Sequence, residues 1–139
     1  MPVDDLARSD VVTATPDTPV RELASAMDDE NVGSIVVVDG ETPVGIVTDR
    51  DLTVRVLGSG GDPDEQTADD VMSDDLRMVD KDAGFYETAN IMSENGVRRL
   101  PVSDGESLVG IITADDLTEL LADEEQQLAE IIRAQRPRY

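Results

Sequence analysis

Two Thr-x-x-Asp sequences are the groups in this chain best placed to do chemistry. Thr48 and Asp51 close the phrase "GIVTDRD", and Thr113 and Asp116 close the phrase "GIITADD". A threonine hydroxyl can donate to a phosphate or ribose oxygen. A carboxylate can accept hydrogen bonds from both hydroxyls of a ribose, and these bonds are strong because the acceptor is charged. If a helix begins here, its N-terminal amides also favour an anion. Each phrase therefore indicates a site for a small polar ligand.

The same residues have a purely structural interpretation. Three small or apolar residues followed by Thr-x-x-Asp are typical of a buried strand that runs into a helix with a capping box. The threonine would then be the N-cap and the aspartate its reciprocal partner, each contributing about 0.5 to 2 kcal/mol to helix stability. The motif alone leaves both interpretations open.

An internal repeat supplies the elements that must position these residues. An offset of 65 residues aligns positions 4–57 with positions 69–122 without a gap. The identical positions fall where structure demands them, as in Met27/Met92, the turn "DGE" at 39–41 and 104–106, and "VGI" at 44–46 and 109–111. We therefore predict one structural unit written twice, with a first repeat at 1–60, a linker at 61–68, a second repeat at 69–122 and a helical extension at 123–139.

Hydrophobic periodicity predicts the order strand, helix, strand, strand, helix in each unit. Val20, Leu23, Ala24 and Met27 have helical spacing, and "SIVVVDGETPVGIVT" reads as a hairpin. The predicted first unit has a strand at 11–14, a helix that starts near 17–19, a hairpin over 34–48 and a helix at 49–57. The predicted second unit has strands at 77–79, 97–102 and 109–113, a helix at 85–94 and a helix from 114. The Gly- and Asp-rich stretch "GSGGDPDEQTADD" reads as the linker.

The C-terminal stretch "ADEEQQLAEIIRAQRPRY" is predicted to extend the last helix. Its basic end, with Arg133, Arg136 and Arg138, suits the negative end of a helix dipole. Two interpretations stay open for its apolar positions, which are packing on its own domain and a contact with a second copy.

Composition excludes several function classes. The formal charge of -21 and the single lysine argue against a basic nucleic-acid-binding face. Such an acidic, lysine-poor composition resembles the surfaces of proteins from extreme halophiles, and the alternative is an acidic surface for a particular basic partner. With no histidine and no cysteine, the usual catalytic bases, nucleophiles and metal ligands are missing. We predict no catalytic residue, no metal site and no cofactor. No apolar run is long enough for a membrane span and no signal peptide is visible, so a cytoplasmic protein without membrane or nucleic-acid partners is expected.

Together these motifs resemble the cystathionine beta-synthase (CBS) domain. The resemblance rests on the opening Asp70-Val71-Met72, an amphipathic helix that ends in Met, the hairpin "RRLPVSDGESLVGIIT" and Thr-x-x-Asp-Leu, and both units fit. It implies an α/β fold in which two β-α-β-β-α repeats pack about a pseudo-twofold axis with two clefts between them, often as homodimers. It also implies an adenosine-containing ligand such as AMP, ADP, ATP or S-adenosylmethionine, and a signal to an unknown effector protein. The alternative is a structural or adaptor protein with vestigial clefts.

The resemblance further implies roles for residues around the clefts. Arg98 and Arg99 would reach across the axis to phosphate held at Thr48 and Asp51, with Arg50 as a further phosphate contact. The alternatives are a surface ion pair for one of the two adjacent arginines and solvent exposure for Arg50. The opposite cleft, marked by Thr113 and Asp116, would face Gly33 and Ser34 and lack that charge. The base side of the first cleft would be lined by a separate group of residues, for which ordinary core packing is the alternative: Val11, Val12, Thr13 and Val32.

Overall fold

The computed structural model describes residues 2–73 and 75–136 and contains two copies of one α/β unit. A short helix, η1 (Val3–Asp5), precedes the first repeat. The first repeat comprises β1 (Thr13–Ala14), α1 (Val20–Glu30), β2 (Ser34–Asp39), β3 (Thr42–Thr48), α2 (Asp49–Asp51) and η2 (Leu52–Leu57). The second comprises α3 (Ala68–Val71), β4 (Val79–Asp80), α4 (Phe85–Asn95), β5 (Arg99–Asp104), β6 (Ser107–Thr113) and α5 (Ala114–Gln135). The predicted element order is confirmed, although both first strands are only two residues long.

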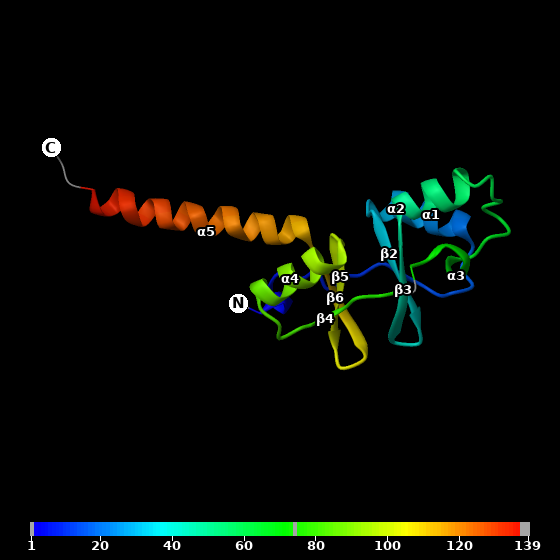
Figure 1. Cartoon of the computed structure of the whole chain (residues 1–139), viewed down its shortest axis with the longest axis horizontal. Coiled ribbons are helices and arrows are strands. Elements are labelled where there is room, and N and C mark those ends of the chain that lie inside the picture. The colour runs from blue at the N-terminus through cyan, green and yellow to red at the C-terminus, as the bar shows by residue number, and fades with distance from the viewer. Residues whose placement is uncertain (1, 74, 137–139) are drawn as a thin grey trace.

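The two sheets have the same topology. Each has three strands, with β1 parallel to β2 and β2 antiparallel to β3 in the first repeat, and β4, β5 and β6 related in the same way in the second. The hairpin turns use Gly40 and Gly105 at φ +66° and +64°, a conformation that L side chains rarely adopt. Figure 1 shows the two hairpins side by side and pointing in the same direction.

The linker supplies hydrogen-bond acceptors to the first amides of α1. This helix begins after Pro19 with no side-chain cap, so its first amides need other acceptors. The amides of Val20 and Arg21 donate to the carbonyls of Gln66 and Pro63, at 2.9 and 3.1 Å. The Arg21 guanidinium also donates to Asp64 at 2.5 Å, and this hydrogen bond holds the pKa of Asp64 below its ordinary value. The predicted linker is therefore tied down along the first repeat.

The segment at the start of each repeat packs on the other repeat. The N-terminal segment lies on the second repeat, where the Val3 amide donates to the Ala83 carbonyl at 2.8 Å and Arg8 bridges to Ile111 through two 3.0 Å backbone hydrogen bonds. Likewise Ser73, just after α3, bridges to Ile46 on the first repeat. Two aliphatic cores result, one that contains α3 and one that contains η1. The exchange makes the two repeats interdependent.

The repeated glycine of "VGI" makes this exchange possible. A Cβ at Gly110 would lie 3.0 Å from the Arg8 carbonyl oxygen, and a Cβ at Gly45 would lie 3.0 Å from the Ser73 carbonyl oxygen and 2.5 Å from the Met72 sulfur. A side chain at either position would push the crossing segment off the strand. The glycines therefore let a second backbone approach β3 and β6 closely.

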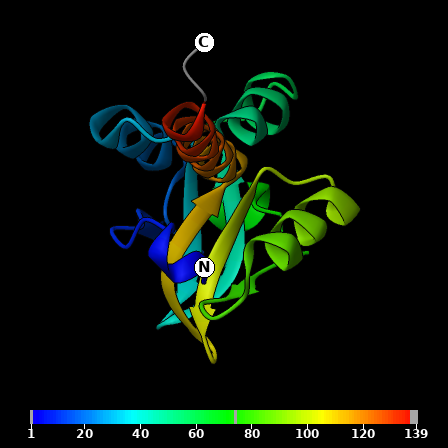
Figure 2. The same ribbon diagram turned by 90° about the vertical axis from the view of Figure 1, so that its left-hand side faces the viewer.

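The last helices of the two repeats differ. The predicted helix at 49–57 is present, but η2 is a π-helix in which the Gly58 amide donates to the Thr53 carbonyl at 2.7 Å. In contrast, α5 is a regular α-helix of 22 residues. It leaves the body of the molecule along its long axis in Figure 1, and Figure 2 shows it end-on between α1 and η2. Its residues from Leu121 to Arg136 are exposed, except half-buried Ala129, so packing of the extension on its own domain is wrong. Arg138 and Tyr139 lie outside the described residues.

Candidate ligand-binding clefts

One cleft lies where the second repeat's Thr113 meets the start of β2. We call it cleft A, and its cavity volume is about 200 Å³. Thr113 and Ile111 come from β6, while Gly33 and Ser34 come from the first repeat, as the sequence predicts for the partner face of Thr113. The full lining is Arg8, Asp10, Val11, Val12, Asn31, Val32, Gly33, Ser34, Arg99, Ile111, Thr113 and Asp115.

The second cleft lies where Thr48 meets the start of β5. We call it cleft B, and its cavity volume is about 240 Å³. Its lining is Ile46, Thr48, Asp49, Arg50, Gly96, Val97, Arg98 and Arg99. The 65-residue offset relates several of these residues to those of cleft A, since Thr48 corresponds to Thr113 and Val97 to Val32. Thr48, Arg50, Arg98 and Arg99 thus share one cleft, as predicted.

The aspartates of both Thr-x-x-Asp motifs form capping boxes. The Asp51 carboxylate accepts from the Thr48 amide at 2.8 Å, and the Asp51 amide donates to the Thr48 hydroxyl at 3.2 Å. Asp116 and Thr113 repeat this arrangement at 2.9 and 3.2 Å. Neither aspartate lines its cleft, and it is Asp49 and Asp115 that do. The structural interpretation of the motif is confirmed, and a ribose contact by Asp51 or Asp116 stays a prediction.

Arg99 lies between the two clefts and lines both of them. Its terminal nitrogen lies 2.9 Å from the point where a Cβ of Gly33 would be, so the absence of a side chain at Gly33 makes room for it. The equivalent residue of the first repeat is Ser34, which is too short to reach across in return. Within residues 2–73 and 75–136, no carboxylate lies within ion-pair distance of the Arg99 guanidinium. Arg99 is a half-buried residue, and its guanidinium is thus available to an anion in either cleft.

The prediction that the Thr113 cleft lacks positive charge is wrong. Arg99 reaches it from β5, and Arg8 reaches it from the exchanged N-terminal segment. Arg8 donates to Asp116 at 3.4 Å, although its own side chain is 65% exposed, so this pair is weak. No sequence pattern indicated Arg8, because its place in the cleft depends on the exchange of segments, which puts residue 8 beside a strand about a hundred positions later in the chain.

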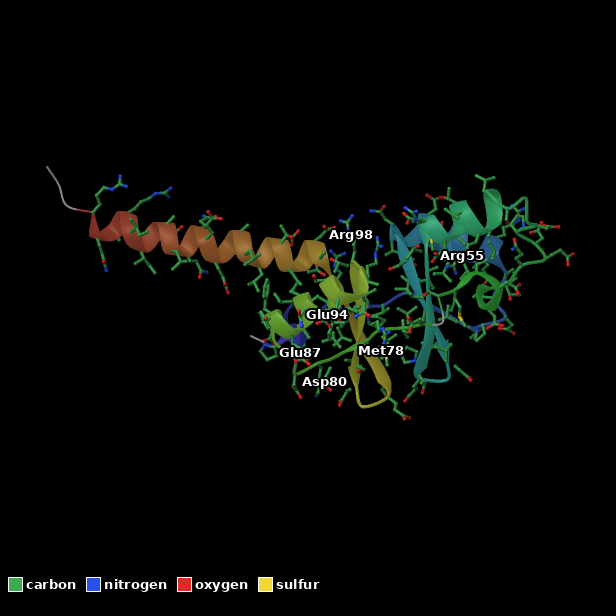
Figure 3. The ribbon with its side chains drawn as sticks, viewed as in Figure 1. Arg55, Met78, Asp80, Glu87, Glu94 and Arg98 are labelled. Carbon is green, nitrogen blue, oxygen red and sulfur yellow. The ribbon has the colours of Figure 1, made fainter. Side chains whose placement is uncertain are left out.

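The clefts still differ in charge. Cleft B has three arginines and one aspartate, and cleft A has two arginines, Arg8 and Arg99, and two aspartates, Asp10 and Asp115. Arg98 is exposed and pairs with Asp115 at 3.4 Å, and Figure 3 shows it on the side of the second repeat that faces the first. In an otherwise acidic chain, cleft B is the more cationic site.

The predicted apolar wall lies in the other cleft. Val11, Val12 and Val32 line cleft A with Thr113, so their predicted place beside Thr48 is wrong. The reason is geometric, because the start of β2 faces the second repeat across the boundary between the sheets. Thr13 lines neither cleft. It pairs with Val36 in the sheet and borders a separate depression beside Gly40.

These features define a class of site. Each cleft combines a threonine at a strand-to-helix turn, apolar side chains and arginines, which suits an organic anion with an apolar ring. Among residues 2–73 and 75–136, no group of three or more acidic side chains is arranged to hold a metal ion. Across the same part of the chain, no helix is long and apolar enough to cross a membrane.

Comparison with known proteins identifies a family and solved structures that share this architecture. The CBS domain family matches residues 3–58 and 68–123. A solved putative signal-transduction protein with CBS domains from Burkholderia ambifaria superposes with a TM-score of 0.79 at 26% identity, covering 99% of this chain and 98% of that chain. The CBS domain pair of another protein, solved with 5'-methylthioadenosine and S-adenosyl-L-methionine, superposes with a TM-score of 0.81 at 24% identity, covering 89% of this chain and 98% of that chain.

The family is therefore settled. The chain belongs to the CBS domain family and contains a tandem pair of these domains, as the sequence resemblance predicted. An uncharacterised protein of Methanopyrus kandleri is 38% identical over 120 residues, which span 85% of this chain but 61% of that protein.

Proposed function

We propose that this CBS pair is a regulatory module that binds an adenosine-containing anion in the clefts between its repeats. The observation that carries the proposal is that each cleft contains both a threonine at a strand-to-helix turn and Arg99. The threonine is Thr113 in cleft A and Thr48 in cleft B. A charged guanidinium fork is suited to phosphate, and the half-buried valines of cleft A suit an adenine ring. The CBS pair with bound adenosine compounds is similar in fold, and the proposal for this chain rests on its own clefts.

The two clefts suit different members of this ligand class. Cleft A offers Val11, Val12 and Val32 but balanced charge, so it favours adenosine compounds with little negative charge. Cleft B has an excess of two positive charges, so it favours ADP or ATP. Both cavities are smaller than the roughly 300 Å³ of typical ligand pockets, so a bound nucleotide would stay partly exposed.

A thermal-shift series tests the proposal. The protein in strong salt is heated with AMP, ADP, ATP or S-adenosylmethionine, and a ligand at about 100 times its Kd should stabilise the fold by about 2.7 kcal/mol. Arg99→Ala should reduce the shift, whereas Arg21→Ala, which removes an arginine that lines neither cleft, should not. If none of the four compounds shifts the midpoint, the proposal fails and the adaptor alternative is favoured.

We also infer that the protein forms a homodimer and that α5 contributes to it. Its exposed apolar side chains recur at helical spacing, at Leu121, Leu128, Ile131 and Ile132, and each is more than half exposed in the described structure. The first half of α5 is acidic and its end carries Arg133 and Arg136, so an antiparallel second copy would bring opposite charges together.

Light scattering with matched variants tests this contact. Leu128→Asp should convert a dimer into a monomer, and Gln126→Asp, which adds the same charge elsewhere on the exposed helix, should not. Because the chain has no cysteine, an introduced Leu128→Cys and Ile131→Cys pair reports contact directly through a disulfide between copies. A monomer at high concentration in strong salt would contradict the homodimer.

The acidic surface supports adaptation to strong salt. A net charge of -21 on 139 residues opposes compaction unless counterions screen it. We expect cooperative unfolding by circular dichroism in strong salt and loss of structure at ~10 mM salt, where the Debye length is about 30 Å. Full structure in dilute buffer would contradict the adaptation. The expected cytoplasmic location and the unknown effector protein belong to the same proposal.

A further inference from the structure

We propose that the two clefts are negatively coupled because they compete for the single guanidinium of Arg99. This inference rests on the proposed function, and it adds a mode of regulation to it. Arg99 lines cleft A beside Thr113 and cleft B beside Thr48, and no second arginine occupies the equivalent position, which is Ser34. One guanidinium therefore serves two anion sites.

The position of the side chain explains the competition. Its terminal nitrogen lies over Gly33, and an oxygen of Asp49 lies 3.4 Å from the same Cβ point, so the guanidinium stands at the boundary itself. An anion in cleft A would draw the guanidinium toward Thr113, and an anion in cleft B would draw it toward Thr48. Because Arg99 is held by no ion pair among residues 2–73 and 75–136, it can move between the clefts.

The other arginines do not share this property. Arg8 lines only cleft A, and Arg50 and Arg98 line only cleft B among the two. Occupation of one cleft leaves these side chains in place in the other. The second ligand therefore loses one charged hydrogen bond and keeps the rest. We call the cleft that fills second the later cleft, and we expect its affinity to be weakened by about tenfold or more. By reciprocity, the later ligand weakens the earlier one by the same factor.

The coupling is measured by reading each cleft separately. Methyl signals of Ile111 report on cleft A and those of Ile46 on cleft B during titration with AMP, and in parallel with ATP, in strong salt. The cleft that fills first is then blocked, by Val11→Trp for cleft A or Ile46→Trp for cleft B, and the other cleft is titrated again. Blocking should tighten the later cleft by about tenfold or more.

The decisive experiment repeats these titrations in the Arg99→Ala variant. In it both clefts should bind more weakly, and blocking one cleft should leave the affinity of the other unchanged. Arg50→Ala is the matched control, because Arg50 lines cleft B alone among the two clefts, so its loss should weaken cleft B and preserve the coupling. If Arg99→Ala does not fold, Arg99→Gln removes the same charge with a longer side chain.

Three results would overturn the inference. If blocking leaves the later cleft unchanged in the wild type, the clefts are independent and only the proposed function stands. If blocking tightens it equally with and without Arg99, direct repulsion between the ligands is the cause. If no methyl signal moves with AMP or ATP while the four-compound thermal series is also flat, the proposed function fails and the coupling fails with it.

Discussion

The two repeats have the same sheet topology, the same hairpin turn and the same capping box. They differ in their last helix and in the residues that they place at the boundary between the repeats. The first repeat has Gly33 and Ser34 at the start of β2 and a π-helix that ends at Leu57, whereas the second has Arg98 and Arg99 at the start of β5 and the long helix α5. The identical positions are those that fold each unit. Buried positions differ as well, as in Leu23/Thr88 and Val36/Pro101, but they keep the same fold, which teaches that the duplicated scaffold tolerates core substitution while charge at the boundary and length of the last helix changed around it.

The largest expected effect tests whether the repeats depend on each other through the exchanged segments. Val3 and Val71 are fully buried, each in the core of the repeat that its segment crosses onto. Val3→Asp and Val71→Asp should each lower the free energy of unfolding by about 3 to 5 kcal/mol, because each buries an unpaired charge. Denaturant titration in strong salt measures the loss.

The control for this pair is Val54→Asp on η2, whose side chain is 54% exposed and whose substitution should change stability by at most about 0.5 kcal/mol. Hydrogen exchange then locates the damage. If Val71→Asp leaves the amides of the first repeat as protected as before, the interdependence of the repeats is wrong.

A smaller difference is expected between the two glycines that admit the crossing segments. Gly110→Ala should cost about 2 kcal/mol, because its Cβ meets the backbone oxygen of Arg8, which cannot easily move. Gly45→Ala should cost somewhat more, since its Cβ meets the Ser73 carbonyl oxygen at the same 3.0 Å and also the Met72 sulfur at 2.5 Å, which must move aside. Thermal unfolding of the two variants gives the order, and a larger loss for Gly110→Ala would reverse the comparison.

Substitutions in the two Thr-x-x-Asp motifs should affect ligand affinity to different extents. Asp51→Asn keeps an oxygen that caps the helix, so unfolding should change little. If Asp51 holds the ribose as predicted, the loss of charged hydrogen bonds to the ribose hydroxyls should weaken ADP or ATP binding in cleft B by about 1 to 3 kcal/mol. Asp116→Asn changes the same motif beside the less cationic cleft A and should impair these ligands less. Calorimetry compares them. Loss of binding only in Asp116→Asn would make cleft A the functional site.

The smallest effect tests the difference between η2 and α5. Replacing a helical glycine by alanine usually stabilises a helix by about 1 kcal/mol. At Gly58 a Cβ would lie 2.7 Å from the Val54 carbonyl oxygen, so Gly58→Ala should instead destabilise by about 1 kcal/mol. Stabilisation in denaturant titration would show that the π-helix relaxes to an α-helix without cost.

Much of the fold was readable from the sequence, because its determinants are local. The 65-residue repeat, the helical spacing of Val20, Leu23 and Met27, and the hairpin turns gave the element order and the family, and Thr-x-x-Asp gave both capping boxes. The pairing of Thr48 with Arg98 and Arg99 followed from the family resemblance. The boundaries of the short strands β1 and β4 were less accurate, because two residues leave almost no periodic signal.

The sequence by itself determined the repeat, the aliphatic cores, the excess negative charge and the caps, since propensity, periodicity and composition act over a few residues. Tertiary structure alone decided that Arg8 reaches cleft A, that Val11, Val12 and Val32 face Thr113 rather than Thr48, and that Arg99 stands between both clefts. The physical reason is that these relations depend on the exchange of segments and on how two sheets meet. Both are set by the burial of surfaces that lie far apart along the chain.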